Sequence, residues 1–246
     1  MKESQLIYGI RPVVEALRSG KEIEKIFLQS TLQGSLLQEL KEEIAKRKTV
    51  VQYVPVEKLN RLTRNNHQGV VAVISLIEYY NFEEIVTQII EKGKMPFLLM
   101  LDRVTDVRNL GAIARSAECA GVDAIIVPQY SSAQINEDAI KTSSGALLRI
   151  PICRELNLKT TINIAKQMGV NVYCATEKGG ELYTQVPMKE SLMIIMGSED
   201  TGVSTEIIKL CDKRIKIPIK ANIESLNVSV AAGILMYEVV RQRDLI

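Results

Sequence analysis

A near-continuous apolar run, FLLML at residues 97–101, constrains the fold of this chain more than any other feature. A strand that is apolar at every position is typical of a parallel sheet covered by helices on both faces. A similar run, LMIIM, lies at residues 192–196. Since parallel strands are joined by crossover connections that are usually helical, these runs predict an α/β architecture.

Strand-like and helix-like segments alternate from residue 97 onward. Strands are expected at residues 97–102, 122–128, 170–176, 191–197 and 213–219. Helices are expected at residues 110–121, 160–169 and 204–212, and from about Asn227 onward. This alternation predicts a mostly parallel sheet with helices on both sides.

The first 75 residues alternate in the same way on a smaller scale. Helices are expected at residues 9–20, 35–48 and 56–63, and strands at residues 24–29, 50–55 and 69–75. We therefore expect a compact α/β domain over residues 1–75. Residues 76–96 combine a linker with a leading helix and end in glycine and proline, so the second domain is expected over residues 97–246.

Composition excludes several classes of protein. Apolar residues make up 46% of the 246-residue chain and charged residues 24%, which suits a globular protein with a real core. No apolar run reaches the ~18 residues that a membrane-spanning helix needs. The opening segment, MKESQLIYGIRP, lacks the apolar core of a signal peptide. We expect a cytoplasmic protein without a membrane partner.

The cysteines and the histidine limit the chemistry. The four cysteines, Cys119, Cys153, Cys174 and Cys211, form no CxxC pair, and we expect reduced residues of the core. With a single histidine, a metal site built from several histidines is excluded, and we expect no metal. Any histidine-based catalysis would have to use His67, which lies in RNNHQGVVAV and is expected in a turn.

Positive charge is concentrated in the N-terminal part. Residues 1–75 carry 12 Lys and Arg against 8 acidic residues, whereas residues 97–246 carry 17 of each. Such an excess fits either a polyanion partner or a solvated basic face.

Four expected strands are followed by polar or glycine-rich loops, at residues 103–115, 177–183, 198–204 and 220–229. Ligands of open α/β sheets bind beyond the carboxyl ends of the strands, so converging loops would form one site. The chain contains neither GxGxxG after a strand nor GxxxxGK[ST], and no glycine-rich loop follows the first strand. Rossmann-type dinucleotide sites, P-loop NTPases and Rossmann-like methyltransferases are therefore disfavoured.

Three of these segments resemble the motifs of a known family, in order and spacing. NLGAIAR at residues 109–115, IMGSEDTGVS at 195–204 and IPIKANIESLNVSVAAGILMYE at 217–238 resemble the motifs of the SpoU (TrmH-type) RNA 2′-O-ribose methyltransferases. YGIRPVVEAL and NHQGVVA near the start resemble the ribosomal-protein-L30e-like RNA-binding domain of one branch, which includes methyltransferases for a guanosine of 23S rRNA. The resemblance spans nearly the whole chain.

The resemblance implies a fold and a reaction. It implies that residues 97–246 form a mostly parallel sheet with a deep trefoil knot, that S-adenosylmethionine is the cofactor, and that the protein is a homodimer. It also implies that a ribose 2′-hydroxyl of RNA accepts the methyl group, so rRNA would be a substrate and DNA would not. A tRNA substrate and a non-catalytic RNA-binding role are the alternatives.

The resemblance also assigns residues. The catalytic candidates it implies are Asn109, Arg115, Glu199, Ser225 and Asn227. The cofactor-binding candidates are Thr176, Gly197, Ser198, Glu199, Ile217, Leu226 and Asn227. Without the resemblance, Asn109, Ser225 and Asn227 would read as helix caps, Glu199 as an acidic residue near a helix N-terminus, and Ile217 and Leu226 as core residues.

RNA contacts are expected from six basic residues. They are Lys46, Arg47, Lys48, Arg61, Arg64 and Arg115. Such residues bind the RNA backbone and contribute affinity rather than sequence specificity. Arg115 would hold an RNA phosphate or organise a proton relay, because guanidinium keeps its own proton at neutral pH.

Overall fold

The computed structural model describes residues 6–47, 49–177, 179–220 and 225–244, and the predicted RNA contact Lys48 lies outside them. The chain divides into two compact units, one ending at Glu78 and the other beginning at Tyr79. Among the described residues, no helix is both long enough and apolar enough to cross a membrane.

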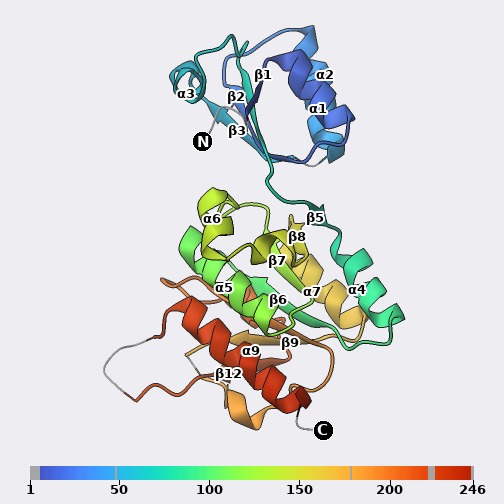
Figure 1. The fold of residues 1–246 in the computed structure, drawn as a ribbon, viewed down its shortest axis with the longest axis vertical. Helices are drawn as coiled ribbons and strands as arrows, with labels where there is room; N and C mark the ends of the chain where they lie inside the picture. The colour runs from blue at the N-terminus through green and yellow to red at the C-terminus, as the bar shows by residue number, and fades with distance from the viewer. Residues whose placement is uncertain (1–5, 48, 178, 221–224, 245–246) are drawn as a thin grey trace. The chain divides into compact units, whose positions relative to one another are not determined.

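The N-terminal unit is a four-stranded mixed sheet with helices on both faces (Figure 1). Its elements are β1 (Leu6–Tyr8), α1 (Ile10–Arg18), β2 (Ile23–Gln29), α2 (Ser35–Arg47), β3 (Val51–Val54), α3 (Val56–Leu62) and β4 (Val70–Ile74). The strand order is β1-β4-β2-β3, and only β2 and β3 run parallel.

Alternation along β2 sorts this unit into two cores. Ile26 and Leu28 pack with α1 and α2 on one face of the sheet, whereas Phe27 packs with Leu59 of α3 on the other. Since successive side chains of a strand point to opposite faces, α2 and α3 lie on opposite sides of the sheet. This separation decides which basic residues can share a surface.

His67 occupies the expected turn before β4. The backbone N–H of Gly69 donates to His67 Nδ1 at 3.0 Å, so Nε2 carries the proton and faces Asn60 Oδ1 at 2.9 Å. The ring is buried, and one of its nitrogens is used within the turn and the other by Asn60 of α3. His67 is thus a structural residue here.

The C-terminal unit is built on an eight-stranded sheet in the order β10-β12-β9-β11-β6-β7-β8-β5, and every recorded strand pair is parallel. The strands are β5 (Tyr79–Tyr80), β6 (Phe97–Leu101), β7 (Ala124–Pro128), β8 (Ile152–Glu155), β9 (Asn171–Ala175), β10 (Glu181–Leu182), β11 (Leu192–Met196) and β12 (Lys213–Lys216). The predicted parallel α/β architecture is confirmed.

Among the described residues, six α-helices and two short 3-10 turns accompany this sheet. The helices are α4 (Phe82–Glu91), α5 (Val107–Cys119), α6 (Glu137–Thr142), α7 (Leu158–Gln167), α8 (Thr205–Ile208) and α9 (Val228–Asp244), and the turns are η2 (Ala146–Leu148) and η3 (Tyr183–Gln185). Residues 76–96, expected to combine a linker with a leading helix, contain β5 and α4, and both belong to the C-terminal unit.

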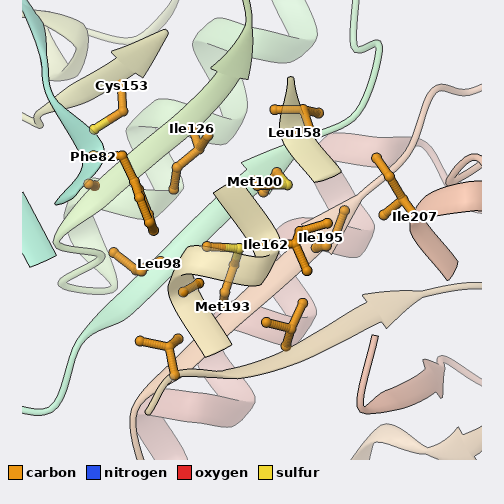
Figure 2. Close-up of a cluster of buried hydrophobic side chains, with 14 of the residues drawn as sticks. Phe82, Leu98, Met100, Ile126, Cys153, Leu158, Ile162, Met193, Ile195 and Ile207 are labelled. Carbon is orange, nitrogen blue, oxygen red and sulfur yellow. The ribbon is translucent and has the colours of Figure 1, made fainter. Parts of the chain in front are cut away.

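The sheet is buried on both faces, as its apolar runs predict. One face carries Leu98, Met100, Met193 and Ile195, which pack against α4, α7 and α8 (Figure 2). Alternate residues such as Leu99 are equally inaccessible and point to the opposite face. There α5 packs against both α6 and α9.

The cysteines are free, but they do not all lie in the core. Cys153 and Cys174 are buried and Cys211 is half-buried, whereas Cys119 is exposed. The expectation of a core residue at Cys119 is therefore wrong, because this cysteine is the last residue of α5 and faces away from the sheet.

Candidate functional site

Four strand ends meet at one edge of the C-terminal sheet. The strand order places β12, β9, β11 and β6 next to one another, and all four run in the same direction. The loops that follow them therefore emerge side by side, as expected for a ligand site in a parallel α/β sheet.

A cavity opens at this edge between the loops that follow β9, β11 and β12 and the beginning of α9. Its empty volume is about 650 Å³, part of it open to solvent, which lies in the range of small-molecule sites. Met196, Ile215, Ile217 and Leu235 give it apolar walls. Six of the seven predicted cofactor-binding residues line it, namely Thr176, Gly197, Ser198, Glu199, Ile217 and Leu226.

Gly197 is required by the loop itself. A Cβ at this position would lie 2.0 Å from the carbonyl carbon of Gly202 and 2.1 Å from the nitrogen of Val203. The backbone of residues 202 and 203 therefore fills the space that a side chain at position 197 would need. The close contact folds residues 198–202 back over the end of β11 and brings Glu199 to the cavity wall.

Asp102 and Arg103, which directly follow β6, hold the C-terminal part of the loop after β11, at residues 202–204. Asp102 is buried and accepts a hydrogen bond of 2.7 Å from the backbone N–H of Ser204. Arg103 donates to Asp102 Oδ1 at 3.1 Å and to the carbonyl of Gly202 at 3.1 Å. Its φ of +60° is unusual for a residue with a side chain, and such strain concentrates at functional sites.

A polar cluster joins the three motif segments. The Asn227 amide nitrogen donates to Asn109 Oδ1 at 3.1 Å and to Glu199 Oε1 at 2.5 Å. These three side chains, here called the Asn–Glu–Asn cluster, come from α5, the loop after β11 and the residue before α9. They remain accessible and can therefore bind a ligand as well as one another.

The helix caps separate the candidate roles of the two asparagines. Asp106, not Asn109, caps α5, since its carboxylate accepts from the backbone N–H groups of Arg108 and Asn109 at 2.8 Å each. Asn227 does cap α9, because its Oδ1 accepts from the Ser229 N–H at 3.0 Å and from the Ser229 hydroxyl. Thus its oxygen serves the helix while its nitrogen serves the cluster.

The residues at the start of α9 face two different places, the cavity and the Asn–Glu–Asn cluster. Ser225 and Leu226 both line the cavity, whereas Asn227 is turned toward the cluster. Ser229 bonds only back to Asn227 among the described residues, which is a structural role within the first turn.

Arg115 is not part of the cluster. It lies on the exposed side of α5, and within the described part of the chain its side chain forms no hydrogen bond or ion pair. It lies six positions after Asn109 on the same helix, which is nearly two turns away. Its guanidinium is free to bind a partner outside the described chain.

The predicted RNA contacts of the N-terminal unit fall on two sides of its sheet. Lys46 and Arg47 end α2, whereas Arg61 lies in α3 and Arg64 follows it. All four are exposed, but the sheet lies between the two pairs, so they do not form one surface.

Asp102 and Arg103 are the site residues that the sequence analysis missed. One signal was available, since Asp102 is the first polar residue after a buried strand, where parallel sheets place their functional groups. The left-handed backbone of Arg103 gave no such signal, because an arginine in a loop predicts nothing about its φ.

Comparison with known proteins agrees with this geometry. Residues 96–237, more than half of the chain, match the family model described as "SpoU rRNA Methylase family". Residues 6–80 match the model described as "RNA 2'-O ribose methyltransferase substrate binding". The chain belongs to the SpoU (TrmH-type) family of RNA methyltransferases. The family resemblance seen in the three motifs is thereby confirmed, while the trefoil knot stays a prediction.

Individual relatives cover almost the whole chain. A Staphylococcus epidermidis protein assigned to the TrmH family of tRNA/rRNA methyltransferases is 36% identical over 241 residues, covering 98% of this chain and 97% of its own length. An AdoMet-bound rRNA methyltransferase structure from Sinorhizobium meliloti is 25% identical, with a TM-score of 0.63 over 99% of this chain and 89% of that one. The AdoMet complex of the SpoU methyltransferase AviRb from Streptomyces viridochromogenes, 22% identical, shares the fold with a TM-score of 0.61 over 97% of this chain and 90% of that one.

Proposed function

We propose that this protein transfers a methyl group from S-adenosylmethionine to a ribose 2′-hydroxyl of RNA, with a guanosine of 23S rRNA as the target. The observation that carries the proposal is the cavity at the carboxyl edge of the sheet with the accessible Asn–Glu–Asn cluster beside it. One region can hold the methyl donor, and the other can hold the acceptor.

The cavity suits a nucleoside-like cofactor. Ile215, Ile217 and Leu226 give it aliphatic surfaces that can cover the faces of a purine. Main-chain groups of residues such as Gly197 lie at its border and can hydrogen-bond the edge of the base. When bound, S-adenosylmethionine supplies a methyl group that its sulfonium already activates.

The contribution of the chain is alignment and deprotonation. Methyl transfer requires the acceptor oxygen, the methyl carbon and the sulfur to be in line, and a fixed arrangement lowers the entropic part of the barrier. We assign the Asn–Glu–Asn cluster to the acceptor ribose, and Ser225 to the border between acceptor and cofactor. The reaction also needs a group that helps the weakly acidic hydroxyl lose its proton.

Arg115 is assigned to an RNA phosphate. A guanidinium is always charged and binds phosphate oxygens through paired N–H groups. Its exposed position and lack of a partner within the described residues suit a ligand that arrives from outside. A role as the proton acceptor itself is disfavoured, because the pKa of arginine lies far above neutral pH.

We further propose that the protein acts as a homodimer through α9. Val230 and Tyr237 lie seven residues apart, on one side of this helix, and both are about half exposed. Apolar residues that line up on a surface helix favour an interface with another protein surface. A second copy of the chain is the partner that the family resemblance implies.

The first test is cofactor binding followed by substrate mapping. Calorimetry of the intact protein with S-adenosylmethionine should show binding at one site per chain. Ribose methylation mapped in rRNA and tRNA from a strain lacking the protein should then show one missing 2′-O-methyl group in 23S rRNA. A missing group in tRNA would assign the tRNA alternative, and no cofactor binding would leave a non-catalytic RNA-binding role.

A further inference from the structure

The wall of the cavity at the carboxyl edge of the sheet carries charge of one sign. Among the described residues that line it, Glu177 and Glu199 are acidic, and none is a lysine or an arginine. Glu177 lies two residues after β9, and Glu199 lies in the loop after β11. Since β9 and β11 are neighbours in the sheet, the two carboxylates come from adjacent strand ends.

Neither of these two charges is compensated by a cation of the described chain. Both glutamates are exposed, and accessible carboxylates are ionised at neutral pH. Glu199 accepts a hydrogen bond from the amide of Asn227, which is uncharged and leaves the carboxylate charge in place. Within the described residues, neither glutamate forms an ion pair, and the side chain of Glu177 forms no hydrogen bond.

The lysines of β12 and the segment after it do not supply the missing charge. Lys213 is paired with Glu181 at 2.8 Å. Lys216 lies between Ile215 and Ile217, which line the cavity, yet it is not itself part of the wall. A cleft with charges of one sign and apolar walls focuses their field, so this cavity favours a cationic ligand over an anionic one.

The methyl donor and its spent product differ by one charge at one atom. S-adenosylmethionine has a positive sulfonium, whereas S-adenosylhomocysteine has a neutral thioether. On transfer, the methyl carbon bonds to the acceptor oxygen, the electron pair of the broken carbon–sulfur bond stays on sulfur, and the hydroxyl proton is released. The amino and carboxyl groups of the cofactor are unchanged. A negative wall therefore stabilises the donor more than the product.

We propose that Glu177 is a specificity residue whose carboxylate favours binding of the positively charged methyl donor over that of its neutral product. The proposal rests on the proposed function, and it adds how the cavity distinguishes the two forms of the cofactor. Glu199 contributes to the same field, but it also belongs to the Asn–Glu–Asn cluster. Substitution of Glu177 therefore tests the charge effect without disturbing the cluster.

The test measures ligand affinity in the full-length protein rather than turnover. Calorimetry gives the dissociation constants of S-adenosylmethionine, S-adenosylhomocysteine and sinefungin, an analogue with a charged amine in place of the sulfonium. Glu177→Gln removes the charge and nearly keeps the shape of the side chain. Asp200→Asn is the matched control, because Asp200 is exposed and follows Glu199 directly but does not line the cavity.

Glu177→Gln is expected to weaken binding of the two cationic ligands about three- to tenfold, as for a partly screened charge pair. Binding of S-adenosylhomocysteine should stay within about twofold. Salt should weaken the cationic ligands relative to the neutral product, because the screening length falls from about 10 Å at 0.1 M to about 3 Å at 1 M ionic strength. That salt effect should be smaller in Glu177→Gln, and Asp200→Asn should change each affinity by less than about twofold.

Three outcomes would overturn the inference while leaving the proposed function intact. Equal weakening of all three ligands by Glu177→Gln would assign the carboxylate to a part of the cofactor that transfer does not change. The other two are no change for any ligand and an equal loss in Asp200→Asn. Retained binding of S-adenosylhomocysteine shows that a variant is folded. If the intact protein binds none of the three ligands, the proposed function and the inference fail together.

Discussion

The two ends of helix α9 are both rich in polar side chains, yet they use them in opposite ways. At its beginning, Asn227 is accessible and bonds to one side chain of helix α5 and one of the loop after β11. At its end, Arg243 donates to the backbone carbonyls of Met95, Pro96 and Glu190 at 3.2, 3.2 and 2.7 Å. At the first end the hydrogen bonds join side chains to one another, and at the second end they join a side chain to backbone carbonyls.

The difference separates function from stability along one helix. Side chains that bond other side chains in the open can rearrange around a ligand. A guanidinium that is half-buried against the Phe97 ring and three carbonyls cannot rearrange without losing the ring contact and three hydrogen bonds together. Substitutions at the first end should therefore affect methyl transfer, and those at the second end should affect folding.

Asn227→Ala should have the largest effect on activity. Loss of the bridge between Asn109 and Glu199 is expected to lower kcat/KM about a hundredfold or more, comparable to losing one essential polar contact in a transition state. Loss of the helix cap should lower the free energy of unfolding by about 1 kcal/mol. Asn227→Ser is the matched control, since serine also caps helices but is too short to bridge the cluster. Recovery of both stability and activity in that variant would contradict the division of roles between the amide atoms.

Arg243→Met should have the largest effect on folding. The variant removes three hydrogen bonds to main-chain carbonyls, and a typical intramolecular hydrogen bond contributes about 0.5–1.5 kcal/mol. Thermal or urea unfolding should show a loss of about 2–4 kcal/mol, with Arg243→Lys in between because its point charge cannot fork between carbonyls. Methyl transfer per folded molecule should be unchanged, and a fall in kcat of the folded fraction would break the comparison.

Arg103→Gly tests the loop after β11, which Arg103 holds at Gly202 and which carries Glu199, the partner of Asn227. Glycine adopts a φ of +60° without strain, so relief of strain and loss of the Arg103 hydrogen bonds should nearly cancel in stability, within about 1 kcal/mol. The loop carrying Glu199 loses the Arg103 hydrogen bond to the Gly202 carbonyl while Ser204 stays bonded to Asp102, and kcat is expected to fall about tenfold with little change in cofactor affinity. Unchanged kcat would show that Arg103 only occupies the turn.

Glu238→Gln should have the smallest effect, at the stabilising end of α9. Hydrogen bonds from Arg241, and to a lesser extent from Gln242, lower the pKa of the buried Glu238 carboxyl. Because the folded pKa is depressed, the stabilisation is present above the unfolded value of about 4.3 and is lost as pH falls through the folded pKa. Urea unfolding at pH 7 should show a loss of about 1 kcal/mol in the variant. That difference should shrink as pH falls through the folded pKa, and a difference that does not change with pH would refute the assignment.

Much of the fold was readable from local pattern. The runs at 97–101 and 192–196 predicted strands buried on both faces, and β6 and β11 are paired centrally in the sheet. The helix expected over 204–212 is wrong in length, since α8 spans only Thr205–Ile208. The Asp212 carboxylate instead accepts from the Val172 N–H at 2.8 Å, and that contact with a neighbouring strand was invisible in the sequence.

The sequence predicted which residues belong to the candidate site, but not the hydrogen bonds that join them. Motif resemblance gave Asn109, Glu199 and Asn227, and the structure brings the three side chains together. Nothing in the sequence indicated that Asp106 rather than Asn109 caps α5, because both residue types cap helices equally well. The basic residues of the N-terminal unit likewise gave a charge excess, but not the side of the sheet on which each one lies.

By itself, the sequence determined what short-range periodicity and residue chemistry can determine: the parallel α/β class, the strand runs, the family motifs and the residue types of a ligand site. Only the tertiary structure decided which atoms meet. Asn227 and Asn109 are 118 positions apart and Arg103 and Gly202 are 99 apart, and each pair is joined by a hydrogen bond of 3.1 Å. Such contacts depend on strand order and loop closure, which arise from packing the whole sheet and leave no signal in the neighbouring residues of the chain.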